Sequence, residues 1–121
     1  GKQSEAKQYV GTLLRSQQAN FLERTDFATD LTALAKPVAS ETENYLYSTT
    51  GSKGTSQSLS LGTSKQTPLR SYAGTVFVVT DPATSETNTT GVLCESKTPR
   101  TTALPAATSV TDCGTDAQVV K

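Results

Sequence analysis

The two cysteines, Cys94 and Cys113, are the residues of this chain whose chemistry is easiest to specify. Both lie in the last third of the 121 residues. An even number of cysteines in a small chain indicates one disulfide formed in an oxidising compartment, and two unrelated buried thiols are the alternative. Their spacing is too wide for a CxxC redox or zinc motif. We therefore expect a Cys94–Cys113 disulfide that closes a loop near the C-terminus.

The residue types that most catalytic and cofactor sites need are missing. The sequence contains no histidine, which removes the usual Ser-His-Asp and Cys-His nucleophile systems and the commonest metal ligand. Neither G-x-x-x-x-G-K-[ST] nor G-x-G-x-x-G occurs, so phosphate-binding loops are not indicated. We expect no enzyme activity, no catalytic residue, no cofactor and no metal.

Two pairs of carboxylates are the remaining candidates for acid–base chemistry or calcium binding. These pairs are Glu41 with Glu43, and Asp112 with Asp116. Acidic residues are almost always solvated unless they are paired. We therefore favour exposed loop charges as the interpretation of both pairs.

Two further signals also have a simpler structural interpretation. Asn88-Thr89-Thr90 matches an N-glycosylation acceptor, but a chance match is expected in a chain this rich in threonine. Tyr45, Tyr47 and Tyr72 are candidates for stacking on bases. Tyrosines on strands more often fill a half-buried face with the hydroxyl at its rim.

Length and charge further narrow the structural and functional classes to which this chain can belong. A chain of 121 residues predicts one domain, 1–121, with a modest core. Basic and acidic residues number 11 each, so the formal net charge is zero. The basic stripe typical of a DNA-binding domain is missing, so DNA binding is possible but not indicated. No run of apolar residues approaches the ~18 needed to span a membrane.

The elements that would position these residues begin with a helix over residues 2–24. Its apolar residues recur mostly at three- and four-residue spacings, and a polar turn from Arg15 to Gln18 interrupts them. The apolar residues are Ala6, Tyr9, Val10, Leu13, Leu14, Phe21 and Leu22. We expect Tyr9, Leu13 and Phe21, flanked by Val10 or Leu14, to pack on a sheet.

A connecting region over residues 25–44 follows the helix. It contains a short helical turn from Asp30 to Ala35, which we expect Thr29 to cap and Pro37 to stop.

Short strands make up the sheet region, about residues 44–95. A hairpin-type turn, Gly51-Ser52-Lys53-Gly54, follows the first strand. The predicted strands are Asn44–Thr50, Gln57–Leu61, Ser71–Thr80 and Gly91–Glu95. Val76 to Val79 are apolar on both faces, as in a central strand covered on two sides. The tail beyond Ser96 is predicted to be a loop.

The fold class is therefore α+β, with one long N-terminal helix on an antiparallel sheet of about four strands. A disulfide-closed loop over residues 94–113 completes the prediction.

Five segments, in this order along the chain, closely resemble cyanobacterial type IV pilins. The resemblance covers most of residues 2–95, which makes it more specific than any short motif. After Glu95 only the placement of Cys113 matches. The segments are Lys2–Gly11, Gln17–Ala28 with gaps, Thr42–Ser48, Ser71–Val79 and Val92–Glu95.

The resemblance implies the pilin fold and a role as a major or minor pilin, a structural subunit of a type IV pilus. In that family an apolar half-helix, preceded by a leader peptide, anchors the subunit in the inner membrane and then packs into the filament core. It implies that both were cut off here to leave a soluble headpiece. It further implies an extracellular filament of such subunits, built by the pilus assembly machinery, for twitching motility, adhesion and DNA uptake. The loop closed by Cys94 and Cys113 resembles the D-region, which commonly lies on the exposed surface.

Some features depart from a typical major pilin and leave alternatives open. Arg15 stands where the helix often carries a small or apolar residue, and the tail is rich in threonine and poor in charge. These features leave open a minor pilin that modifies the filament, and a minor pilin that binds DNA or a surface is a further alternative. A pseudopilin of a type II secretion system shares the helix-on-sheet plan. The two cysteines favour the pilin, because the commonest pseudopilins have a calcium loop in that place.

Overall fold

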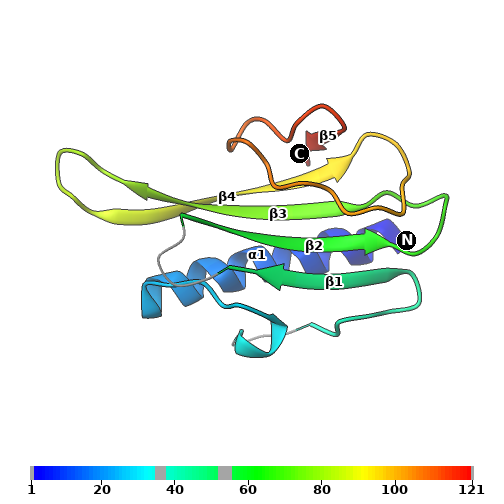
Figure 1. The fold of residues 1–121 in the computed structure, drawn as a ribbon, viewed down its shortest axis with the longest axis horizontal. Helices are drawn as coiled ribbons and strands as arrows, with labels where there is room; N and C mark the ends of the chain where they lie inside the picture. The colour runs from blue at the N-terminus through cyan, green and yellow to red at the C-terminus, as the bar shows by residue number, and fades with distance from the viewer. Residues whose placement is uncertain (1, 35–37, 52–55, 121) are drawn as a thin grey trace.

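The computed structural model describes residues 2–34, 38–51 and 56–120. Within these residues, one long helix lies along a single five-stranded antiparallel sheet (Figure 1), which confirms the predicted α+β class. The elements in chain order are α1 (Lys2–Arg24), η1 (Leu31–Ala33), β1 (Tyr45–Thr50), β2 (Gln57–Ser64), β3 (Tyr72–Thr80), β4 (Thr87–Ser96) and β5 (Ala117–Val119).

Helix α1 buries a narrow stripe because its buried side chains recur every three or four positions. The side chains of this stripe belong to Ala6, Val10, Leu13 and Gln17. Gln17 was expected to interrupt the stripe, but it is completely buried. Leu22 was expected to belong to the stripe, and that was wrong because its side chain is 63% exposed.

Both ends of α1 carry charges that suit the helix dipole. Glu5 lies in the first turn and Arg24 in the last, and each offsets the partial charge of its end. The helix ends where Thr25 takes a left-handed conformation with φ of 57°. The backbone N–H of Thr25 donates to the carbonyl of Phe21 at 2.7 Å, which satisfies one of the last carbonyls.

The strands follow each other across the sheet in chain order, β1-β2-β3-β4-β5, and all neighbours are antiparallel. Two sequence predictions need correction. β4 begins at Thr87, although residues 87–90 were predicted to be a connection. β5 lies in the tail that was predicted to be a loop. Three residues are too short for a recognisable alternation, so β5 exists only through its pairing with Cys94 to Ser96.

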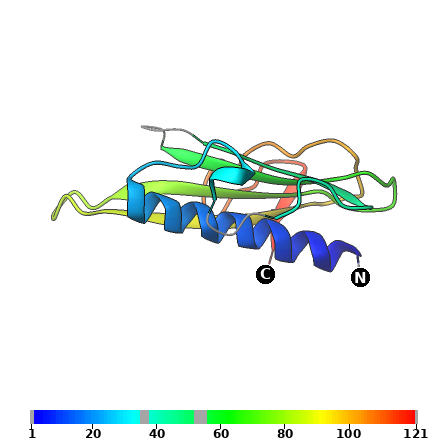
Figure 2. The same cartoon turned by 90° about the horizontal axis from the view of Figure 1, so that it is seen from below.

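The sheet is covered on both faces, but the run Val76 to Val79 that was expected to be covered on two sides is not: Val76 is buried, Phe77 and Val78 are half-buried and Val79 is 48% exposed. Helix α1 lies on one face and the C-terminal segment after β4 lies on the other (Figure 2). Under the helix, Val10 and Leu13 pack with Tyr45, Tyr47 and Tyr72 and other side chains. The buried residues of the opposite face are Ala73, Val92, Cys94, Leu104, Ala107, Cys113 and Ala117.

The connection between α1 and β1 contains η1, where a short helical turn was expected. Asp30, and not Thr29, is its N-cap, since the Asp30 carboxylate accepts the N–H of Ala33 at 3.1 Å. A hydrogen bond from the Thr32 hydroxyl, with smaller effects, holds the pKa of Asp30 below its ordinary value. The predicted stop at Pro37 and the turn residues Ser52 to Gly54 lie outside the described residues.

Candidate functional site

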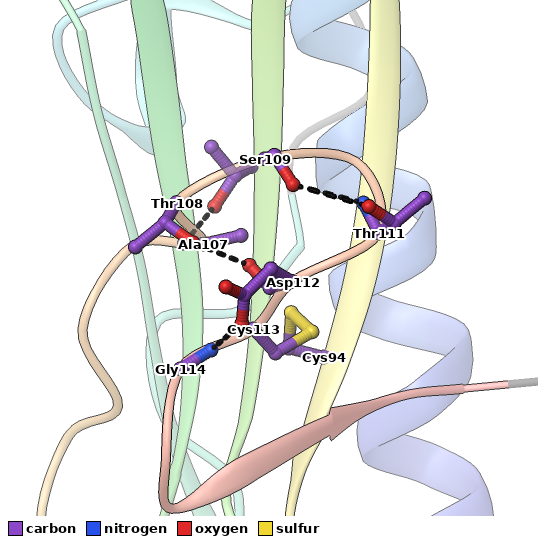
Figure 3. Close-up of a disulfide and its surroundings, with 9 residues drawn as sticks. Cys94, Ala107, Thr108, Ser109, Thr111, Asp112, Cys113 and Gly114 are labelled. Atoms are coloured by element: carbon purple, nitrogen blue, oxygen red, sulfur yellow. Dashed lines mark hydrogen bonds between the residues drawn. A yellow bond between two sulfur atoms is a disulfide. The ribbon is translucent and has the colours of Figure 1, made fainter.

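Cys94 and Cys113 form a disulfide that ties the C-terminal segment to β4 (Figure 3). The two Cα atoms are 5.9 Å apart and the residues are separated by 19 positions. Cys94 is 1% exposed and Cys113 is 4% exposed, so the bridge is buried. The backbone N–H of Ala107 donates to the Thr75 hydroxyl at 3.1 Å, which attaches the segment to β3 as well.

The turn before Cys113 is closed by its own polar groups. The N–H of Thr108 donates to the carbonyl of Asp112 at 2.9 Å. The Asp112 carboxylate accepts the N–H of Gly114 at 2.9 Å, and Gly114 has φ of 94°, a conformation that favours glycine. Residues 108–112 are all exposed. The segment therefore presents a hydroxyl-rich surface that is held in place from below by the disulfide.

Glu95, next to Cys94, accepts hydrogen bonds from three other parts of the fold. The Tyr72 hydroxyl donates to its Oε2 at 2.5 Å, and Arg70 and Gln118 donate to its Oε1, both at 3.3 Å. The Lys7 ammonium group lies 3.8 Å from Oε2. Glu95 lies on β4, so its carboxylate links this strand to α1, to the β2–β3 turn, to β3 and to β5.

The surroundings of Glu95 shift two pKa values in opposite directions. Burial raises the pKa of Glu95, but the hydrogen bonds from Tyr72 and Gln118 and the charges of Lys7 and Arg70 outweigh it. The net effect lowers that pKa below its ordinary value of 4.5. Burial, with the hydrogen bond to Glu95, raises the pKa of Tyr72. Both groups therefore hold their usual charge states near neutral pH.

A second carboxylate joins the helix to β1 and to the loop before it. Glu5 Oε2 accepts the Tyr47 hydroxyl at 2.7 Å and the Thr42 hydroxyl at 3.0 Å. Burial, followed by this hydrogen bond, raises the pKa of Tyr47. Burial and the nearby charges of Glu5 and Glu95 raise the pKa of Tyr45 to about 12. The tyrosines suggested as base-stacking candidates are thus mostly enclosed between helix and sheet.

The residues expected to pack the helix on the sheet lie at different depths. Val10 and Leu13 are completely buried. Tyr9 is half-buried, with its ring 5.1 Å from that of Tyr47. Half-buried Leu14 faces Gly74 and Gly91, whereas half-buried Phe21 lies 5.0 Å from the ring of Phe27 in the connection after α1.

Two glycines and Gln17 shape this contact, and the sequence analysis missed their role. A Cβ atom on Gly62 would lie 2.8 Å from Val10, and one on Gly91 would lie 2.8 Å from Leu14. Only glycine therefore permits the observed approach of α1 to the sheet. The Gln17 amide donates to the carbonyl of Ala28 at 2.9 Å and accepts the N–H of Ala28 at 2.8 Å. The sequence did contain a signal for this role: Gln17 follows Leu13 by four residues, so both side chains lie on the same face of the helix.

The other candidate residues form no common site. Glu41 pairs with Lys65, Glu43 is exposed, and Asp112 caps its own turn. The Asn88 side chain accepts the N–H of Thr89 at 2.9 Å and is exposed. Among the described residues, no group of three or more cysteine, aspartate or glutamate side chains is arranged to hold a metal ion.

An open groove of about 720 Å³ lies beside β5, with Lys7 and Lys97 on its wall.

Comparisons with known proteins complete the description of these surfaces. The family model described as type IV pilin-like G and H matches residues 3–118. No curated protein and no solved structure matches the chain at a significant level. Among the residues that the structure describes, no helix is both long enough and apolar enough to cross a membrane.

Proposed function

The chain belongs to the type IV pilin-like G and H family, and from that premise we propose that it is the headpiece of a type IV pilus subunit. The family implies a structural role in assembly with other subunits of the pilin or pseudopilin type. The family match, which spans the helix, the sheet and the disulfide-tied segment, is the observation that carries this proposal.

The proposal includes the parts of a pilin that lie ahead of residue 1. An apolar half-helix in the full gene product would anchor the subunit in the inner membrane, with the headpiece in the periplasm, before assembly. After assembly the half-helices would form the filament core and the headpieces its surface, in support of twitching motility, adhesion and DNA uptake.

The disulfide supports a pilin over a pseudopilin of a type II secretion system. In this chain Cys94 and Cys113 hold the C-terminal segment on the sheet, where the commonest pseudopilins use a calcium loop. The exposed turn at residues 108–112 would then be available on the filament surface.

Isolation of surface filaments tests the proposal. Filaments sheared from cells that carry the complete gene should contain this chain, detected by mass spectrometry and by antibodies against the folded headpiece. Cells that lack the pilus assembly ATPase serve as the control, because they make the subunit but should release none. A chain that stays in the envelope, with secretion of exported enzymes lost on deletion, would identify a pseudopilin. Wild-type filaments without the chain, together with normal secretion on deletion, would rule out both functions.

A further inference from the structure

The hairpin between β3 and β4 extends past the rest of the sheet. The strand pairing of β2 with β3 ends at Phe77, followed by one bond from the N–H of Val78 to the carbonyl of Ser56 at 2.9 Å, and β5 pairs with β4 only from Cys94 onwards. From Val79 onwards the end of β3 pairs only with β4 among the residues that the structure describes, and these two strand ends project beyond the C-terminal end of α1 (Figures 1 and 2). Residues 79–88, which we call the arm, are all exposed.

The tip of the arm is held in one shape by local hydrogen bonds. The N–H of Asp81 donates to the carbonyl of Glu86, and the N–H of Ser85 donates to the carbonyl of Asp81, both at 2.8 Å. The Asp81 carboxylate also accepts the N–H of Ala83 at 2.8 Å. A shape fixed before contact lowers the entropy cost of binding. The tip of the arm thus has a defined shape although the core of this domain does not bury it.

The arm carries negative charge that no basic residue within it balances. Asp81 and Glu86 are its charged residues, and no lysine or arginine occurs between Ser71 and Ser96. Neither carboxylate forms an ion pair with any residue that the structure describes. Both side chains therefore present free negative charge at one end of the molecule.

The opposite end of the same two strands is basic. Around Tyr72 and Glu95 the chain brings together α1, the β2–β3 turn and the segment after β4, and we call this surface the basic end. Its basic residues are Lys2, Lys7, Arg70, Lys97 and Arg100, and its acidic residues are Glu5, Glu95, Asp112 and Asp116, so the basic residues exceed the acidic ones by one. Contacts join these elements: the N–H of Arg70 donates to Gln3, that of Arg100 to Leu69, and that of Lys97 to Asp116.

Two cations of the basic end remain unpaired. Glu95 is shared by Lys7 and Arg70, and Arg100 donates to backbone carbonyls of its own turn. Lys2 and Lys97 are exposed and form no ion pair within the described residues. The molecule is neutral overall, yet one end of the β3–β4 pair carries unpaired carboxylates alone, whereas the other end presents the unpaired cations Lys2 and Lys97.

We propose that the acidic arm of one copy docks on the basic end of a second copy of this chain. The inference rests on the proposed function, since it names the contact by which neighbouring headpieces would meet along the filament. The two surfaces differ, so the contact is heterologous, and its repetition builds an open filament when the rotation between copies does not close into a ring. Exposed ion pairs are individually weak and are screened by salt. The contact therefore sets the register of subunits that the filament core holds together.

A charge swap in the full-length subunit tests this contact. Asp81→Lys with Glu86→Lys, and separately Lys2→Glu with Lys97→Glu, should each reduce sheared filaments by roughly tenfold or more, because like charges then face each other. The four changes together should restore filaments. Glu23→Lys with Glu43→Lys, which changes the total charge as much as the arm variant does at exposed positions outside both surfaces, should leave assembly intact. Circular dichroism melting of each purified headpiece verifies that it folds.

Carbodiimide cross-linking of wild-type filaments gives a direct readout. This reagent joins a carboxylate to an amine in contact, and we expect peptides that link Asp81 or Glu86 to Lys2 or Lys97. Such links must join different copies, because the arm and the basic end lie at opposite ends of one molecule (Figure 1). Normal assembly of the arm variant, or a four-fold variant that folds but fails to assemble, would overturn the inference. Wild-type filaments that lack this chain would instead refute the proposed function.

Discussion

At the scale of single residues, buried and half-buried polar side chains join the elements of this fold. Glu95, Glu5 and Gln17 each bridge segments that are far apart in the chain. A buried carboxylate is stabilising only when hydrogen bonds and charges replace its lost hydration. The Glu95 carboxylate meets this condition through Tyr72, Arg70, Gln118 and Lys7.

Replacement of Glu95 by glutamine should destabilise the headpiece. Loss of its charge weakens the bonds from Tyr72 and Arg70, so the free energy of unfolding should fall by roughly 1–3 kcal/mol at neutral pH. Urea unfolding followed by circular dichroism measures this change. Glu43→Gln, at an exposed carboxylate, is the matched control and should shift the value by less than about 0.5 kcal/mol.

The same pair of variants carries a pH signature. The pKa of Glu95 is lowered in the folded state, so its contribution is complete above the ordinary pKa of the unfolded chain. The contribution is lost as the pH falls through the folded-state pKa. The stability difference between wild type and Glu95→Gln should therefore shrink in acid. A difference that stays constant from neutral pH down to about pH 2 would assign the effect to packing and not to charge.

At the scale of elements, the sheet has two different covers. Helix α1 is attached by a continuous stripe of side chains over Gly62 and Gly91. The segment after β4 contributes few apolar residues, chiefly Leu104 and Ala107, and depends on the disulfide. When the disulfide is removed, the C-terminal segment should therefore unfold from the sheet while α1 stays packed on the other face.

A headpiece with both Cys94→Ala and Cys113→Ala should lose the outer cover first. The disulfide spans 19 positions, and the chain-entropy model assigns a loop of this size about 3 kcal/mol of stability. Hydrogen exchange should show lost protection in residues 97–120, while α1 keeps most of its protection. Equal loss of protection in α1 would mean that the two covers unfold together.

At the scale of the whole molecule, the headpiece has no large apolar surface among its described residues. Its exposed large apolar side chains are Leu22, Leu46, Val79 and Val110, which belong to the helix, β1, the arm and the C-terminal turn. Stable protein interfaces need contiguous, well-packed area. The exposed charges at the two ends supply direction to a contact but little affinity.

The isolated headpiece should therefore be a monomer at micromolar concentration. Analytical ultracentrifugation at low and high salt measures its mass, which is 12.7 kDa for one copy. The full-length subunit, with its proposed apolar half-helix, is the comparison and should form filaments. A dimer of the headpiece that persists at high salt would reveal an apolar interface in place of the proposed charged contact.

The sequence by itself determined the α1 helix, the four longer strands and the family. These features depend on patterns that repeat over many neighbouring residues, such as the spacing of Val10 and Leu13 and the apolar run of β3. The cysteine count likewise predicted the disulfide, because only one pairing within the chain is possible for Cys94 and Cys113.

Only the tertiary structure decided β5, the length of the arm and the role of Glu95. β5 is three residues long, and its strand form depends on β4 lying beside it. The polar residues at the start of β4 resemble a loop until β3 pairs with them. The partners of Glu95 come from residues 7, 70, 72 and 118. No local pattern connects such distant positions, because their proximity results from the order of the strands and the path of the helix across them.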